Sequence, residues 1–380
     1  MGNITKLGIG TIGLGGTYGK INLAEYSFAI RYALDAGISL VDTSSSYGDA
    51  EKLVGIILQD YPHVKVSGRL EASELIHEKN LKSGIKRCCE ASLNNLGKEC
   101  IDFYHFQGNR LNRTIDEIVE GLELIKKEGK IKSYGISDIE EKDIQQFISQ
   151  GNPESILFEY SAIQRQNAEK IFEQCKEKKL IKIAYGITGR GYLSSGLREL
   201  AYLEEGDIRR ELTLFDEHHV QRNKEVLQAI SAIAKQKGLT SAQVAIAWVL
   251  SDPRLDYGMM STSRYLHVIE NIQGAELELL EDELEYLDTT TFYAEKRLME
   301  NELERAREIL FKEIISPKEG RKKLLEVVNV AISRKLVDEE KLLPTLFDLY
   351  KFEEARHTTK YLNLIREELK EVIKLEKDAV

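Results

Sequence analysis

The strongest constraint on the fold is an alternation of short apolar runs with amphipathic stretches that continues almost to residue 290. The short runs are rich in β-branched and aromatic residues, as strands are. Eight strands are expected, at residues 6–11, 38–42, 63–68, 101–107, 131–137, 155–160, 180–186 and 257–261. Strands that alternate with helices form parallel sheets, and eight such units predict an α/β fold of the (β/α)8 TIM barrel type.

The segments between the strands have helical periodicity and end near Gly or Lys, as helix C-termini prefer. Examples are "LAEYSFAIRYALDAG", "SGIKRCCEASLNNLG", "TIDEIVEGLELIKKEG" and "AEKIFEQCKEKKL". Such barrels carry their chemistry at the carboxyl ends of the strands and in the loops that follow. The longest loop, residues 187–222, is far above the usual loop length, so we expect it to fold over a ligand or to be mobile.

Composition excludes several classes of protein. With 42% hydrophobic and 31% charged residues the chain has enough apolar material for a core. The net charge of −10, without a long run of Lys and Arg, argues against nucleic acid. No leader pattern and no apolar run of spanning length are present, which predicts a soluble, cytoplasmic protein without membrane contact. Four cysteines show neither metal-ligand spacing nor a disulfide framework, so we expect buried thiols and no metal: Cys88, Cys89, Cys100 and Cys175.

The amino-acid composition of the chain changes after about residue 290. Of its 27 glycines only Gly320 lies beyond that point. The stretch "EKRLMENELERAREILFKEII" places five apolar residues on one helical face: Met299, Leu303, Ala306, Leu310 and Ile314. We therefore expect a barrel over 1–290 and a helical C-terminal domain over 291–380. Its apolar faces need to be buried against the barrel, against a second copy in a homo-oligomer, or against a protein partner.

Two motifs near the N-terminus raise opposing interpretations. "VDTSSSYGDAEKLVG" sets Asp42 and Tyr47 five residues apart where a strand ends, either as an ordinary turn or as the rim of an active site. "GIGTIG" at residues 8–13 matches the glycine fingerprint of a dinucleotide-binding turn, which a helix must follow. The following "LGGTYGK" cannot open a helix, so we expect a glycine-rich barrel strand and loop.

Seven segments in order resemble the aldo-keto reductases, over about residues 5–290. They are "GIGTIGLGG", "ALDAGISLVDTSSSYGDAEKLVGIIL", "ASLNNLGKECIDFYHF", "KKEGKIKSYGISD", "IAYGITGRGYLSSG", "SAQVAIAWVL" and "VIENIQGAELELLEDELEYLD". The resemblance implies reduction of the carbonyl group of a small-molecule substrate with NADP(H), with NAD(H) as the alternative cofactor. Family members use a tetrad of Asp, Tyr, Lys and His at the mouth of the barrel.

On this resemblance Asp42 and Tyr47 take the first two tetrad positions, and the phenol would donate a proton to the substrate carbonyl oxygen. The third strand offers Arg69 where the family has Lys, and the fourth offers Gln107 where it has His. Arg keeps the positive charge but does not lend a proton, whereas Gln donates a hydrogen bond but is no acid. His105 precedes Gln107 by two residues, and we expect it in the barrel interior rather than as a displaced tetrad member.

The resemblance also implies a nicotinamide pocket. Ser137 and Asp138 fall where the family's Ser-Asn pair holds the carboxamide, and Leu157 falls where it has Gln. Tyr185 would stack on the nicotinamide ring. Two residues would line the pyrophosphate: Arg190 and Leu193.

At the adenosine end, the segment "STSR" would meet the 2′-phosphate near a helix start, through Ser261, Thr262, Ser263 and Arg264. An ordinary helix cap is the alternative interpretation of this segment. Two further residues would lie beside the adenine: Glu270 and Asn271. His267 stands where many members have Arg, so the phosphate site is less cationic, although NADP remains favoured over NAD.

Three functions stay open at this point. The first is an NADP(H)-dependent oxidoreductase acting on the carbonyl or alcohol of a small, sugar-like substrate. The second is a nicotinamide-binding epimerase or eliminase in which Arg69 binds a substrate carboxylate or phosphate. The third is a catalytically silent cofactor-sensing or scaffold protein.

Overall fold

A computed structural model of the chain describes residues 3–108, 114–139, 141–176, 178–194, 203, 205–215 and 217–294. The chain divides into two units, Met1–Glu295 and Lys296–Val380. The second unit lies outside the described residues, as does part of the predicted loop at 187–222. The helical domain proposed for 291–380, and the partner or oligomer contacts proposed for it, therefore remain predictions.

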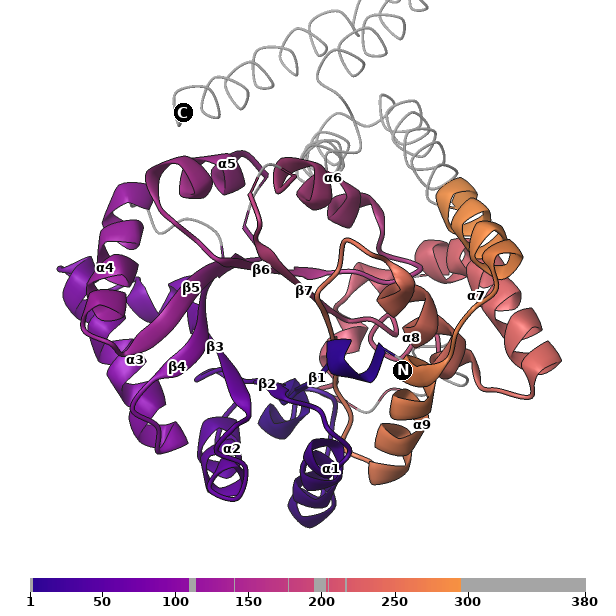
Figure 1. The fold of residues 1–380 in the computed structure, drawn as a ribbon, viewed down its shortest axis with the longest axis horizontal. Helices are drawn as coiled ribbons and strands as arrows, with labels where there is room; N and C mark the ends of the chain where they lie inside the picture. Colours follow the sequence, from indigo (N-terminus) through magenta and orange to yellow (C-terminus); the bar gives the residue numbers. More distant parts are fainter. Residues whose placement is uncertain are drawn as a thin grey trace, which may run out of the picture. The chain divides into compact units, whose positions relative to one another are not determined.

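Eight parallel strands close into a barrel in which each strand pairs with its neighbours in chain order and β8 returns to β1 (Figure 1). The strands are β1 Leu7–Gly10, β2 Leu40–Asp42, β3 Lys65–Glu71, β4 Ile101–Gln107, β5 Ile131–Ser137, β6 Ser155–Glu159, β7 Ile181–Tyr185 and β8 Tyr257–Met260. The predicted (β/α)8 barrel is confirmed. The glycine-rich stretch at 8–13 forms β1 and the start of a 3₁₀ turn, η2 Ile12–Gly15, and not a strand that leads into an α-helix.

Helices surround the ring of strands in Figure 1. They are α1 Leu23–Asp35, α2 Ala50–Leu58, α3 Leu81–Leu96, α4 Ile115–Lys127, α5 Glu141–Gln150, α6 Gln166–Gln174, α7 Glu217–Lys237, α8 Ser241–Ser251 and α9 Tyr265–Glu276. Side-chain caps fix where several begin, because they satisfy N–H groups that have no partner within the helix. Asn22 and Asn80 cap α1 and α3, and Thr114 and Thr240 begin α4 and α8 in capping boxes.

The barrel interior is layered. Its apolar layer consists of one inward-facing residue from each of five strands: Leu40, Phe103, Leu157, Ile183 and Met259. The next inward position toward the carboxyl ends is polar, and His105 lies there with no solvent exposure. Its Nδ1 lies 3.3 Å from Ser67 Oγ and its Nε2 lies 2.9 Å from Ser155 Oγ. Gly135 makes room for the imidazole, since a Cβ there would come within 2.6 Å of it.

His105 is therefore an interior residue, as the sequence indicated. Its two ring nitrogens contact the hydroxyls of Ser67 on β3 and Ser155 on β6, so it lies inside the barrel.

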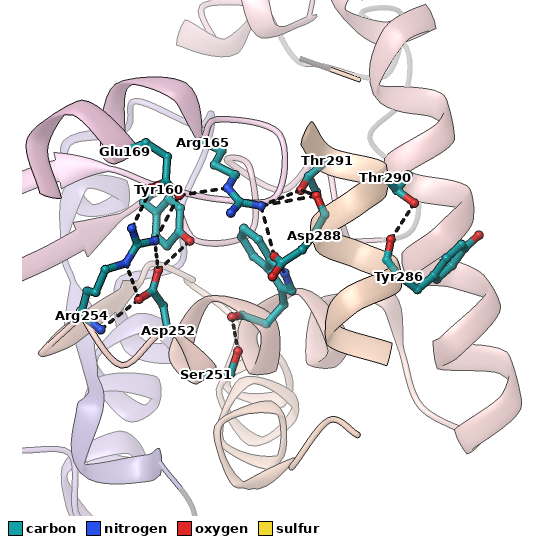
Figure 2. A network of polar contacts seen from close by, with 11 residues as sticks. Tyr160, Arg165, Glu169, Ser251, Asp252, Arg254, Tyr286, Asp288, Thr290 and Thr291 are labelled. Carbon is teal, nitrogen blue, oxygen red and sulfur yellow. Dashed lines mark hydrogen bonds and ion pairs between the residues drawn. The ribbon is translucent and has the colours of Figure 1, made fainter. Parts of the chain in front are cut away.

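A helix over residues 281–294 is fastened to the barrel by a polar network (Figure 2). Arg165 Nη1 donates to Asp288 Oδ1 at 3.1 Å and to Thr291 Oγ1 at 3.2 Å. The indole N–H of Trp248, on α8, donates to the same Asp288 oxygen at 3.0 Å. The guanidinium of Arg165 lies 5.8 Å from the centre of the Trp248 ring. One carboxylate thus joins this helix to both Arg165 and Trp248.

The described residues also bear on the cysteines, on membrane-spanning helices and on metal-binding clusters. The four cysteines are free, and three of them are buried. Across the described ranges no helix is long and apolar enough to cross a membrane. Within the same ranges no cluster of three or more His, Cys, Asp or Glu side chains is arranged to hold a metal ion.

The contact between Trp248 and Asp288 should be measurable in unfolding experiments. Trp248 is only 3% exposed, so Asp288→Ala leaves a buried indole N–H without its acceptor. We expect this variant to lose about 1–3 kcal/mol of unfolding free energy, measured by urea titration with the fluorescence of the single tryptophan. Glu285→Ala, an exposed position on the same helix, is the control. Equal stabilities of the two variants would contradict the assignment.

Candidate active site

The barrel brings the predicted catalytic side chains to one end because they lie at or near the carboxyl ends of adjacent strands. Asp42 ends β2, Gln107 ends β4 and Ser137 ends β5. Arg69 lies on β3, beside His105 in register, and Gln107 pairs in register with Ser137. Side chains alternate along a strand, so Arg69 points to the same side as Ser67, which contacts Asp42.

A buried ion pair forms the centre of this site. Arg69 Nη2 donates to Asp42 Oδ2 at 2.7 Å, and Nε lies 3.4 Å from Oδ1. Asp42 is 2% exposed and Arg69 is 6% exposed, while Ser67 Oγ donates a further bond to Asp42 at 2.7 Å. Burial alone would lower the pKa of Arg69, but the attraction of Asp42 together with Tyr47 and Asp138 raises this pKa above its ordinary value. The guanidinium therefore stays charged.

A chain of hydrogen bonds continues from this pair across the mouth. Arg69 Nη1 donates to Gln107 Oε1 at 3.1 Å, and Gln107 Nε2 donates to Asp138 Oδ2 at 3.1 Å. Tyr185 donates its hydroxyl to Asp138 Oδ1 at 2.5 Å. These bonds orient the Gln107 amide with its oxygen toward Arg69. One N–H of the amide remains for a substrate, because an amide nitrogen has two.

Tyr47 lies in the turn between β2 and α2, beside the ion pair. Its backbone N–H donates to Ser44 at 3.1 Å, and its ring centre lies 5.8 Å from the guanidinium carbon of Arg69. Removal from water raises the pKa of Tyr47 above its ordinary value, Arg69 lowers it, and Asp42 raises it. The phenol is therefore protonated at neutral pH. Its hydroxyl makes no hydrogen bond to any residue of the described ranges, which leaves it available to a ligand.

Two arginines border the ring of Tyr185. The guanidinium carbon of Arg69 lies 5.5 Å from the ring centre and that of Arg190 lies 5.6 Å from it. Burial raises the pKa of Tyr185 well above its ordinary value, which keeps it a hydrogen-bond donor to Asp138. Arg190 Nε donates to Glu159 Oε1 at 2.8 Å.

Sequence reasoning missed Glu159, the last residue of β6. It missed Glu71, the last residue of β3, as well. The available signal was the same in both cases, a carboxylate at the carboxyl end of a barrel strand.

The residues expected around a nicotinamide differ in the polar groups that they offer it. Ser137 Oγ is buried and has no hydrogen-bond partner among the described residues, although such groups nearly always have one. A carboxamide would satisfy it. Leu157 is fully buried in the apolar layer and offers no polar group, while Asp138 sits beside Ser137 in a left-handed backbone conformation with φ of 49°. Leu193 is also fully buried.

The segment expected to meet the adenosine end lies between β8 and α9. Arg264 is the N-cap residue of α9 and makes no side-chain cap bond, and its backbone N–H donates to Thr262 Oγ1 at 3.3 Å. The first N–H groups of α9 are thus without a side-chain cap, which suits an anion. Ser261 is exposed and Ser263 partly so. In the second turn of α9, Glu270 is partly exposed and Asn271 is buried.

Comparison with known proteins identifies the family. A model of the aldo/keto reductase family matches residues 6–291, so the chain belongs to the aldo-keto reductase family. Membership of this family supports an oxidoreductase activity.

Solved structures share the fold. A glycerol dehydrogenase from Gluconobacter oxydans matches with a TM-score of 0.65 at 22% identity, covering 75% of this chain and 90% of that chain. An aldo/keto reductase from Klebsiella pneumoniae in complex with NADP and acetate matches with a TM-score of 0.59 at 22% identity. This match also covers 75% of this chain and 90% of that chain. The holo form of an aldo-keto reductase from Bacillus halodurans matches with a TM-score of 0.58 at 22% identity, covering 75% of this chain and 91% of that chain.

The buried imidazole predicts a pH dependence of stability. Burial lowers the pKa of His105 from 6.5 to about 4. The folded state therefore holds the neutral form while the unfolded chain takes up a proton, so stability is lost as pH falls from about 6.5 toward 4. The loss should reach roughly 3 kcal/mol.

Unfolding free energies measured by urea titration between these pH values should show a shallower acid dependence for His105→Gln than for the parent protein. His63→Gln, at an exposed position, is the matched control. If His105→Gln keeps the parental slope, His105 is not the residue that titrates.

Proposed function

We propose that the protein is an NADP(H)-dependent oxidoreductase that acts on the carbonyl or alcohol of a small, sugar-like substrate, with Tyr47 as the proton donor. One observation carries this proposal. A protonated phenol with a free hydroxyl lies beside a buried Asp42–Arg69 pair at the end of the barrel where such folds carry their chemistry.

The cofactor assignment is supported by the polar groups around the mouth. Ser137 and Asp138 would hold the carboxamide, and Tyr185 would stack on the nicotinamide ring. Arg190 and Leu193 would lie along the pyrophosphate. The loop that contains Ser261, Thr262, Ser263 and Arg264 would bind the 2′-phosphate, and Glu270 and Asn271 would lie beside the adenine. When bound, NADPH supplies the hydride. NADP is preferred over NAD because Arg264 adds a cation to the uncapped start of α9.

The residues at the mouth have distinct roles in the proposed reaction. Tyr47 donates its proton to the carbonyl oxygen as negative charge develops there. Arg69 stabilises the resulting phenolate, and the free N–H of Gln107 orients the carbonyl oxygen. Arg69 does not relay the proton, because its guanidinium stays protonated, so the phenol is reprotonated from solvent. The raised pKa of Tyr47 makes it a weak acid and predicts slow turnover.

The second function considered from the sequence requires Arg69 to bind an anionic substrate. The structure favours it less, because Asp42 and Gln107 already engage Arg69 through Nε, Nη1 and Nη2. A silent sensor or scaffold protein would use the C-terminal residues to bind its partner, and no described residue of the barrel favours that function specifically.

Replacing the phenol tests the proton donor. Tyr47→Phe removes one hydroxyl and should lower kcat by about 10²–10⁴-fold, because general-acid catalysis contributes that much. NADPH affinity should be unchanged, since the hydroxyl contacts the substrate and not the cofactor. Steady-state NADPH oxidation and a binding titration followed by cofactor fluorescence give the two values. Equal activity of variant and parent would exclude the phenol as the acid.

Restoring the usual family residues tests the roles of Arg69 and Gln107. The double variant Arg69→Lys with Gln107→His supplies an amine and an imidazole that can both exchange protons, so turnover of simple aldehydes should rise. The measurement is kcat/KM over a panel of aldehydes, with each single variant as the control. A double variant no faster than the parent would argue that other residues limit the rate.

A further inference from the structure

Five described residues at the mouth carry charged side chains that contact one another or Tyr185. Arg69 is paired with Asp42, and Arg190 is paired with Glu159. Asp138 accepts hydrogen bonds only from neutral groups, namely the Gln107 amide and the Tyr185 hydroxyl. Within the described ranges, no ion pair involves Asp138. Among these five described residues, the carboxylates therefore outnumber the guanidinium groups by one.

Two further carboxylates border Tyr47. Glu71 ends β3 and accepts a hydrogen bond from the hydroxyl of Ser46, the residue before Tyr47. Glu74 accepts from Ser45 Oγ at 2.9 Å and from the backbone N–H of Glu71 at 3.0 Å. Neither carboxylate forms an ion pair within the described part of the chain. The turn that carries the phenol is thus bound directly to two acidic side chains.

Glu71 lies on the same strand as Arg69 and beside Gln107. It follows Arg69 by two residues on the same strand and pairs in register with Gln107, so its side chain lies on the same side of the strand as Arg69. It is only partly buried, and its second oxygen lies 3.4 Å from Ser73 Oγ. A substrate held by Tyr47 and Gln107 would therefore lie close to the Glu71 carboxylate.

We propose that this site selects an uncharged, hydroxyl-bearing carbonyl compound and rejects the corresponding carboxylate or phosphate ester, with Glu71 and Asp138 as the selecting residues. The inference rests on the proposed function and names its substrate class. Carboxylates accept hydrogen bonds from substrate hydroxyls and repel substrate anions. A single like charge a few ångströms away costs an anion roughly ten-fold in affinity at the edge of a protein.

The test compares neutral and anionic members of matched pairs, with NADPH oxidation as the readout. Glyceraldehyde is paired with glyceraldehyde 3-phosphate, and butyraldehyde with succinic semialdehyde. We expect kcat/KM to be at least about ten-fold higher for the neutral member at low salt. The ratio should shrink as salt is added, because salt screens the repulsion.

Substitution of Glu71 gives the residue-specific readout. Glu71→Gln keeps the shape and removes the charge, so it should lower the neutral-to-anion ratio by about three- to ten-fold. Glu120→Gln, on the exposed face of α4, removes an equal charge away from the mouth and should leave the ratio unchanged. A preference for the anionic members, or an identical ratio in Glu71→Gln and the parent, would overturn the inference while leaving the oxidoreductase proposal intact.

A binding measurement distinguishes failure of the proposed oxidoreductase activity from failure of the proposed charge selection. If no aldehyde oxidises NADPH, the proposed function fails, and ligand-observed NMR with glycerol and glycerol 3-phosphate then decides the charge selection. Binding of glycerol alone would support it. Stronger binding of glycerol 3-phosphate would overturn it.

Discussion

The buried pair between Arg69 and Asp42 is the interaction on which the rest of the site depends. Both groups are almost fully removed from water, where either charge alone would be strongly unfavourable. Each is compensated mainly by the other, so the pair fixes the guanidinium in one place. From that position Arg69 meets Tyr47, Gln107 and Tyr185. The geometry of the mouth therefore follows from one ion pair between adjacent strands.

This arrangement also shows what a guanidinium group provides at this position. Arg binds Asp42 through two nitrogens and still reaches Gln107 with a third, which a single ammonium group cannot do in that planar geometry. The result is a rigid chain of hydrogen bonds in which the Gln107 amide has a defined orientation. The guanidinium places a positive charge beside the phenol but does not exchange a proton with it.

The sequence was sufficient to predict the barrel and the strands on which Asp42, Arg69 and Gln107 lie. Alternating strands and helices leave few topologies, and strand ends in a closed parallel barrel must converge. The contacts of Asp138, Glu71 and Glu159 could not be predicted, because they join different strands and loops through side-chain geometry that no local pattern encodes. The helix at 281–294 illustrates the same limit, since its attachment depends on Asp288 meeting Trp248 from a distant part of the chain.

The polar chain at the mouth also determines what a bound cofactor would encounter. Ser137 Oγ is one of the buried groups that lack a hydrogen-bond partner among the described residues, and it adjoins Asp138, the next residue in the chain. A crystal structure of the protein with NADP⁺ tests the central claim most directly. We predict the nicotinamide carboxamide on Ser137 Oγ, with the ring stacked on Tyr185 and the Asp42–Arg69 pair intact. A nicotinamide bound elsewhere, or a mouth closed to it by Arg69, would contradict this prediction.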